Sequence, residues 1–127
     1  MLNNEINKIL IAEDDDLNYI IVSRIVSNYP KLNLKPERAE NGFEVLEKME
    51  SESYRLVIMD IQMPEMDGFE ATKIIRTKNN SIPIIGFTAF TQNSELESIL
   101  QSGCNDYLTK PLNVDNLYKI FDKYLIR

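Results

Sequence analysis

Short apolar runs alternate with longer segments of helical periodicity along the whole chain. The candidate strands are residues 9–12, 34–39, 56–59, 84–87 and 106–108. The runs at 9–12, 56–59 and 84–87 are continuous, which is typical of strands buried on both faces of a parallel sheet. The segment 34–39 is more polar and contains Pro36, which cannot donate to a ladder. We therefore expect that strand at an edge of the sheet.

Apolar residues between these runs recur at the spacing of amphipathic helices. The predicted stripes are Leu17, Ile20, Ile21 and Ile25; Val45, Leu46 and Met49; Ala71, Ile74 and Ile75; Leu96, Ile99 and Leu100; and Leu117, Ile120, Phe121, Tyr124 and Leu125. Asn41 and Asp67 each precede a Glu by three residues, the spacing of a capping box, and Asn113 is a candidate cap. Gly103 can close the fourth helix. We expect every stripe to face the core.

The resulting order is strand then helix, five times over. This order predicts an α/β domain of parallel strands joined by right-handed crossovers, with helices on both faces of the sheet. A length of 127 residues suits one domain over residues 1–127, and we expect residues 1–7 to form a short flexible tail.

Polar residues follow the apolar runs that we expect at the centre of the sheet. Glu13 and Asp14 follow the first run, Asp60 the third, Thr88 the fourth and Lys110 the fifth. In open α/β sheets, ligands bind beyond the carboxyl ends of the strands. We therefore predict that these five side chains line one crevice.

Three carboxylates in one crevice repel one another, because two unit charges ~4 Å apart cost roughly 4 kcal/mol at an effective dielectric near 20. Either one of them protonates or a cation binds among them. The chain has no histidine and one cysteine, Cys104, so oxygen ligands and a hard cation are expected. Mg²⁺ is the first choice, with Mn²⁺ or Ca²⁺ as alternatives. Lys110 and Thr88 can contact an anion beside it, and an aspartate can accept a phosphoryl group.

Net charge and composition argue against several classes of function and cellular location. A net charge of −6 without a basic run argues against nucleic-acid binding. The first residues lack the basic region and long apolar stretch of a signal peptide, and no segment approaches the ~20 apolar residues of a membrane span. We therefore expect a cytoplasmic protein with no membrane contact. The absence of histidine excludes a serine–histidine–aspartate triad.

The polar positions Glu13, Asp14, Asp60, Thr88 and Lys110, together with the segment MPEMDG after the central Asp, resemble a known family. It is the receiver domain of two-component response regulators, which has the fold of the bacterial chemotaxis regulator. The resemblance implies a flavodoxin-like sheet of order 2-1-3-4-5. It also implies a signalling domain that catalyses only its own phosphorylation and dephosphorylation. The phosphodonor would be a sensor histidine kinase or a histidine phosphotransfer protein.

The resemblance assigns the metal and phosphoacceptor roles residue by residue. Asp60 matches the phosphoacceptor, and Glu13 and Asp14 match the acidic pair that holds Mg²⁺. Asp14 is the expected direct ligand, whereas Glu13 can act through water. Gln62 matches the position whose backbone carbonyl also binds the metal.

Three further positions match the phosphate-binding and switching residues of the family. Lys110 matches the phosphate-pairing lysine, Thr88 the switch hydroxyl and Tyr107 the aromatic switch residue. Phosphorylation is then expected to change the surface formed by the fourth helix, fifth strand and fifth helix. Asn18 stands where many receivers have Asn, and Phe90 falls at a variable position linked to the dephosphorylation rate.

Three alternative functions fit the residues of this chain less well. A phosphohydrolase with an aspartyl nucleophile often needs a second acid two residues later, where this chain has Gln62. A flavin- or nucleotide-binding module would need a glycine-rich loop after the first strand, where acids stand instead. A receiver-like interaction module that is never phosphorylated would not need the intact set of five polar positions. The sequence identifies no downstream target or output domain.

Overall fold

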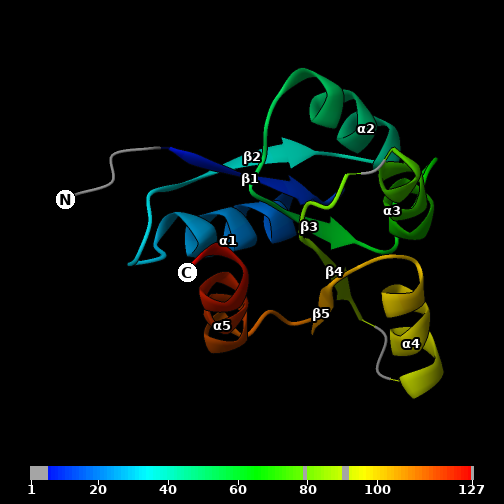
Figure 1. Cartoon of the computed structure of the whole chain (residues 1–127). Coiled ribbons are helices and arrows are strands. Elements are labelled where there is room, and N and C mark those ends of the chain that lie inside the picture. Colours follow the sequence, from blue (N-terminus) through cyan, green and yellow to red (C-terminus); the bar gives the residue numbers. More distant parts are fainter. Residues whose placement is uncertain (1–5, 79, 90–91, 127) are drawn as a thin grey trace.

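The computed structural model describes residues 6–78, 80–89 and 92–126 (Figure 1). The strands are β1 (Asn7–Ala12), β2 (Leu34–Ala39), β3 (Leu56–Asp60), β4 (Ile84–Thr88) and β5 (Asp106–Thr109). The helices are α1 (Asp16–Ser27), α2 (Gly42–Ser51), α3 (Gly68–Thr77), α4 (Asn93–Gln101) and α5 (Val114–Leu125). Strands and helices alternate as predicted. Asn7, the last residue of the segment expected as a tail, is the first residue of β1.

The five strands form one parallel sheet in the order β2-β1-β3-β4-β5. β2 lies at the edge and places Pro36 opposite Ile9 of β1, so the prediction of a proline-containing edge strand is confirmed. The chain leaves β1 in one direction to form β2 and returns to the other side of β1 to form β3. This reversal puts the topological switch point beside the carboxyl end of β1.

Helices cover both faces of the sheet, with α1 and α5 on one face and α2, α3 and α4 on the other (Figure 1). In β1, Ile9 and Ile11 belong to the core under α1 and α5, while Leu10 and Ala12 belong to the core on the opposite face. Both faces of this strand are therefore buried. That is the physical reason for its continuous apolar run.

Side-chain caps define the beginnings of four helices. The capping residues are Asp15, Asn41, Asp67 and Asn113, and each accepts a hydrogen bond from the backbone N–H three residues later. Gly103 follows α4 with φ of 115°, a backbone conformation that glycine adopts without strain. Asn41, Asp67, Asn113 and Gly103 thus lie at the helix boundaries predicted for them from the sequence. Within the described part of the chain, no helix is long and apolar enough to cross a membrane.

The apolar stripe predicted for α1 is wrong for three of its members. Leu17, Ile20 and Ile21 are 65 %, 45 % and 46 % exposed, whereas Val22 and Val26 are buried against the sheet. Apolar residues occur around most of this helix, so periodicity alone could not select the buried face. The three exposed residues form an apolar surface in contact with solvent.

Gly68 begins α3 where that helix passes close to the end of β3. A Cβ at this position would lie 2.5 Å from the carbonyl oxygen of Asp60 and 3.0 Å from the Cα of Ile61. We expect Gly68→Ala to lower the free energy of unfolding by about 2 kcal/mol, because backbone atoms would have to shift. Urea unfolding followed by circular dichroism measures this loss. Glu97→Ala in α4 is the exposed control, with a change within about 0.5 kcal/mol; equal stability of the two variants would contradict the close packing.

Candidate functional site

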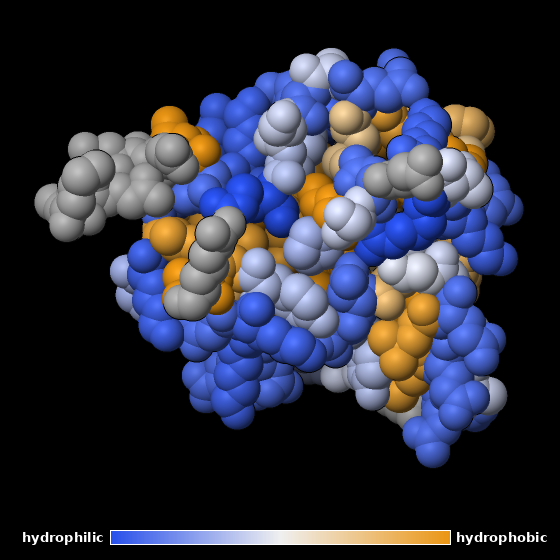
Figure 2. Space-filling model, in the orientation of Figure 1, coloured by the Kyte–Doolittle hydropathy of each residue, from blue (hydrophilic) through white to orange (hydrophobic). Residues whose placement is uncertain are grey.

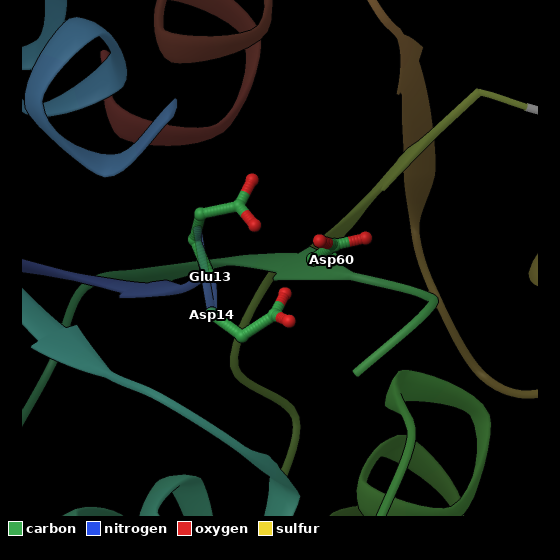
Figure 3. Close-up of side chains that lie close together, drawn as sticks. All are labelled: Glu13, Asp14 and Asp60. Carbon is green, nitrogen blue, oxygen red and sulfur yellow. The ribbon is translucent and has the colours of Figure 1, made fainter. Parts of the chain in front are cut away.

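Three acidic side chains meet at the carboxyl edge of the sheet. Glu13 and Asp14 follow β1, and Asp60 is the last residue of the neighbouring strand β3. Figure 3 shows their carboxyl groups close to one another at this edge, and one carboxylate oxygen from each lies within 4.8 Å of the others. The convergence follows from the parallel pairing of β1 with β3, which brings the ends of both strands to the same place.

Asp60 is a buried carboxylate whose two oxygens both have partners. Its side chain is almost fully enclosed, and the residue is 3 % exposed. The Lys110 ammonium lies 3.0 Å from Oδ2, and the backbone N–H of Gln62 donates to Oδ1 over 3.1 Å. Burial of a charged group is tolerated only with such compensation. The apolar strand therefore ends in a charge that a nearby cation and an amide stabilise.

Lys110 is the basic group of the site, brought there by the chain after β5. Its backbone N–H donates to the carbonyl of Thr88 over 2.7 Å, so the turn is tied to the end of β4. Its ammonium lies 3.0 Å from Asp60 Oδ2, 3.4 Å from Glu13 Oε1 and 5.0 Å from the centroid of the Phe87 ring. Burial lowers the pKa of Lys110, but the two carboxylates raise it by more, so the pKa lies above its usual value. The amine is therefore protonated at neutral pH.

Glu13 is the most deeply buried of the three acids. It is 1 % exposed, and its Oε1 atom accepts no hydrogen bond from the residues that the structure describes. Burial raises the pKa of Glu13 to about 7, and the nearby Asp60 adds to this effect, while the Asp15 amide and Lys110 oppose it. The single positive charge of Lys110 is therefore insufficient to offset the negative charge of the three acids.

The residues of this cluster fit a hard divalent cation. The donor set consists of carboxylate oxygens alone, all within reach of one point, and one buried oxygen lacks a hydrogen bond. These are the ligands that Mg²⁺ and Ca²⁺ prefer. A bound cation would give Glu13 Oε1 a ligand contact in addition to the Lys110 ammonium at 3.4 Å, and it would reduce the repulsion among the three carboxylates.

The other predicted site residues lie at or near the same edge. Thr88 is the buried last residue of β4 and is in register with Thr109 of β5. Tyr107 is half-buried in β5 and packs against the core under α2, α3 and α4. Gln62 follows Asp60 with an exposed side chain, so its contribution would have to come from the backbone. Phe90 lies outside the described residues.

Arg38 is a residue near the site that the sequence did not reveal. It lies in β2, and its Nε atom donates to the backbone carbonyl of Glu13 over 3.0 Å. Its Nη1 atom lies 2.8 Å from Asp16 Oδ1. A charged residue in the most polar strand was visible in the sequence. Its contact with the acidic loop depends on the register of β2 against β1, which sequence periodicity does not specify.

Comparisons with known proteins identify the family. The family model of the response regulator receiver domain matches residues 9–122. The chain is 40 % identical over 121 residues to hybrid signal transduction histidine kinase G of Dictyostelium discoideum, covering 92 % of this chain and 4 % of that protein. It is 36 % identical over 117 residues to the transcription factor SKN7 of Saccharomyces cerevisiae, covering 92 % of this chain and 18 % of that protein. The chain thus spans less than a fifth of the length of these relatives.

Solved structures show the same fold. A two-component response regulator from Clostridium difficile is 30 % identical, with a TM-score of 0.86 and coverage of 95 % of this chain and 97 % of that one. The receiver domain of the Pseudomonas aeruginosa sensor histidine kinase PA1611, with a magnesium ion coordinated in its active-site cleft, is 29 % identical. Its TM-score is 0.84, with 94 % and 97 % of the two chains covered. The resemblance seen in the sequence is confirmed, and so is the flavodoxin-like strand order. The chain belongs to the response regulator receiver domain family of two-component and phosphorelay signalling.

Proposed function

We propose that Asp60 accepts a phosphoryl group from a phosphohistidine on a partner protein, in a reaction that requires Mg²⁺. The observation that carries this proposal is the convergence of Glu13, Asp14 and Asp60 at one edge of the sheet, with the Lys110 ammonium on the Asp60 carboxylate. The chain has no histidine, so the donor must be a separate group. The domain would turn over no other substrate and would act only on its own phosphorylation state.

The metal would be held by the carboxylates of Asp14 and Asp60, with Glu13 binding directly or through water and Gln62 adding its backbone carbonyl. Mn²⁺ is an alternative to Mg²⁺ because both prefer oxygen ligands. When bound, the cation supplies positive charge that offsets the charge of the phosphoryl oxygens during transfer. The magnesium ion in the cleft of the PA1611 receiver domain supports this assignment.

The transfer itself is a displacement at phosphorus. A carboxylate oxygen of Asp60 forms the new P–O bond while the P–N bond to the donor imidazole breaks and its electron pair stays on the imidazole nitrogen. The products are an aspartyl phosphate and a histidine that takes up a proton from solvent. Lys110, held over Asp60 in the resting state, pairs with a phosphoryl oxygen, and the Thr88 hydroxyl contacts another.

The product adds a charge of about −1.5 to −2 to the site at neutral pH. We propose that Thr88 moves toward this group and that Tyr107, on the adjacent strand, turns inward behind it. Both residues are close to the surface formed by α4, β5 and α5, where a downstream partner would bind. Figure 2 shows an apolar patch beside α4. Separately, Leu100 of α4 is 44 % exposed. Such a patch suits a protein partner.

The phosphodonor would be a sensor histidine kinase or a histidine phosphotransfer protein in the cytoplasm. The receiver domain of yeast Ssk1, crystallised with the histidine phosphotransfer protein Ypd1, is 31 % identical to this chain, with a TM-score of 0.83 and coverage of 93 % and 88 % of the two chains. In this chain, the exposed apolar residues Leu17, Ile20 and Ile21 of α1 follow the acidic loop directly. We propose that the donor protein covers this surface when its histidine reaches Asp60.

The first test of the proposal is labelling by acetyl [³²P]phosphate in the presence of Mg²⁺. We expect Asp60→Asn to abolish labelling, because the amide cannot form an acyl phosphate. Asp115→Asn, which makes the same change at an exposed position in α5, should label like the parent protein. Label that persists on Asp60→Asn would refute the assignment of the phosphoacceptor. Steady release of phosphate from a small ester would instead favour a phosphohydrolase.

The second test is the pH dependence of Mg²⁺ affinity. Glu13 has a pKa raised to about 7 without metal, so it is protonated below that pH and must lose its proton when the cation binds. We therefore expect Mg²⁺ to bind about tenfold more weakly at pH 6 than above pH 8. Calorimetric titrations across this range measure the effect. Glu13→Gln should bind more weakly and depend less on pH; an identical profile in that variant would exclude Glu13 as the titrating group.

The third test separates donor docking from chemistry. We expect Ile20→Asp to slow phosphoryl transfer from a phosphorylated histidine phosphotransfer protein about tenfold or more, because a charge would be placed in an apolar contact. The rate with acetyl phosphate, which needs no docking surface, should stay the same. Leu100→Asp, the same kind of change on exposed α4, is the control for the protein donor. Equal loss with both donors would show that the substitution damages the site or the fold.

A further inference from the structure

Arg38 links the edge strand β2 to the acidic loop that follows β1. Its position in β2 is in register with Ile11 of β1, two residues before Glu13. From there the side chain, which is 22 % exposed, reaches along the edge of the sheet toward the loop. Its guanidinium carbon lies 5.1 Å from the centroid of the Tyr19 ring of α1, so the stem and head group are packed as well as charged.

Arg38 has an ion pair with Glu40, just after β2, in which its Nη2 atom lies 3.7 Å from Oε1, and two further polar contacts that lie on either side of Asp14. Its Nε atom donates to the backbone carbonyl of Glu13 over 3.0 Å, and this carbonyl belongs to the peptide group that joins Glu13 to Asp14. Its Nη1 atom lies 2.8 Å from Oδ1 of Asp16, two residues beyond Asp14. The guanidinium therefore holds the chain before and after a residue whose own side chain is exposed.

The two contacts do not have equal weight. The Asp16 side chain is 84 % exposed, so its ion pair with Arg38 is screened by solvent and contributes little by itself. The bond to the Glu13 carbonyl is different, because the N–H of the same residue already donates to the carbonyl of Ala39 over 2.9 Å. Neighbouring residues of β2 thus hold Glu13 at both of its backbone polar groups.

The acidic loop needs such an anchor. Glu13, Asp14, Asp15 and Asp16 are consecutive acids, and Asp60 lies beside the first two. Their repulsion favours a loop that spreads apart when no cation is bound. A guanidinium presents several donors in a rigid plane and can hold two acceptors at fixed spacing, whereas an ammonium acts as a point charge.

We propose that Arg38 is a positioning residue for metal binding, which orients the Glu13–Asp14 peptide so that the Asp14 carboxylate faces Asp60 before the cation arrives. This inference rests on the proposed Mg²⁺ site. Arg38 does not touch the metal or the phosphoryl group. It acts through the backbone of the loop, as groups behind metal ligands do when they fix ligand orientation.

A simple charge effect would have the opposite sign. A cation near a Mg²⁺ site repels the metal, so removing the charge of Arg38 would tighten binding by about twofold in screened solvent. Loss of positioning would weaken binding, because the loop would have to be ordered at the expense of binding free energy. The direction of the change therefore distinguishes the two roles.

The experiment measures the Mg²⁺ dissociation constant by calorimetry at about pH 8, where Glu13 is ionised. We expect Arg38→Gln to bind Mg²⁺ about tenfold or more weakly than the parent protein. Arg38→Lys keeps the charge but not the planar fork, and we expect it to bind several-fold more weakly. Arg24→Gln, the same charge change at an exposed position in the last turn of α1, should stay within about twofold.

A second measurement uses the metal-free protein. Amide hydrogen exchange in the presence of a chelator should be faster at Asp14 and Asp15 in Arg38→Gln than in the parent protein, while exchange in β3 should be unchanged. Circular dichroism and thermal unfolding establish that each variant is folded. Should Arg38→Gln fail to fold, Arg38→Lys decides the question, because a role in charge alone predicts unchanged affinity for it.

The inference would be overturned if Arg38→Gln bound Mg²⁺ as tightly as the parent protein or more tightly. It would also be overturned if Arg38→Lys had the Mg²⁺ affinity of the parent protein. Both outcomes would leave the proposed function intact. A parent protein that binds no Mg²⁺ would overturn the proposed function, and this inference with it. Weaker binding in both Arg38 variants, with parental affinity in Arg24→Gln, would establish the positioning role.

Discussion

The ion pair between Asp60 and Lys110 is the interaction around which this site is built. Asp60 stands at the end of a fully buried strand, where an isolated carboxylate would be strongly unfavourable. The ammonium at 3.0 Å and the amide of Gln62 compensate it, and Lys110 is in turn fixed to the end of β4 by its own backbone. These two contacts of Lys110 join β3 and β4 to the chain after β5. The ion pair compensates the buried carboxylate at the edge of the sheet.

The same edge of the sheet carries three acidic side chains, and the single positive charge of Lys110 does not offset their negative charge. Glu13 is buried with one oxygen that accepts no hydrogen bond among the described residues, and burial raises its pKa to about 7. Under the proposed function, this imbalance would favour a bound cation, and the lysine would favour a bound anion. A group that brings both, such as a phosphoryl group with its metal, satisfies the site better than either alone. The electrostatic strain of the folded chain thus favours the proposed chemistry.

The rest of the fold holds these groups in place. Two apolar cores, one on each face of the sheet, fix the strands, and close packing of Gly68 against the Asp60 carbonyl fixes the start of α3. The β1–α1 loop is held by β2 through backbone atoms and Arg38. By contrast, α1 leaves Leu17, Ile20 and Ile21 exposed next to the site. The proposed docking of a phosphodonor rests on this acidic centre lying beside an uncovered apolar helix face.

The amino-acid sequence by itself determined the element order, the edge position of the proline-containing strand, the helix caps and the identity of the acids, the hydroxyl and the lysine at the strand ends. These follow from local rules, because strand burial, capping and the direction of parallel strands depend on residues close in the sequence. Tertiary structure alone decided which face of α1 is buried, since that helix is apolar around most of its surface. It also decided the raised pKa of Glu13 and the reach of Arg38 to the Glu13 carbonyl. Burial and strand register depend on residues far apart in the chain, and no local pattern encodes them.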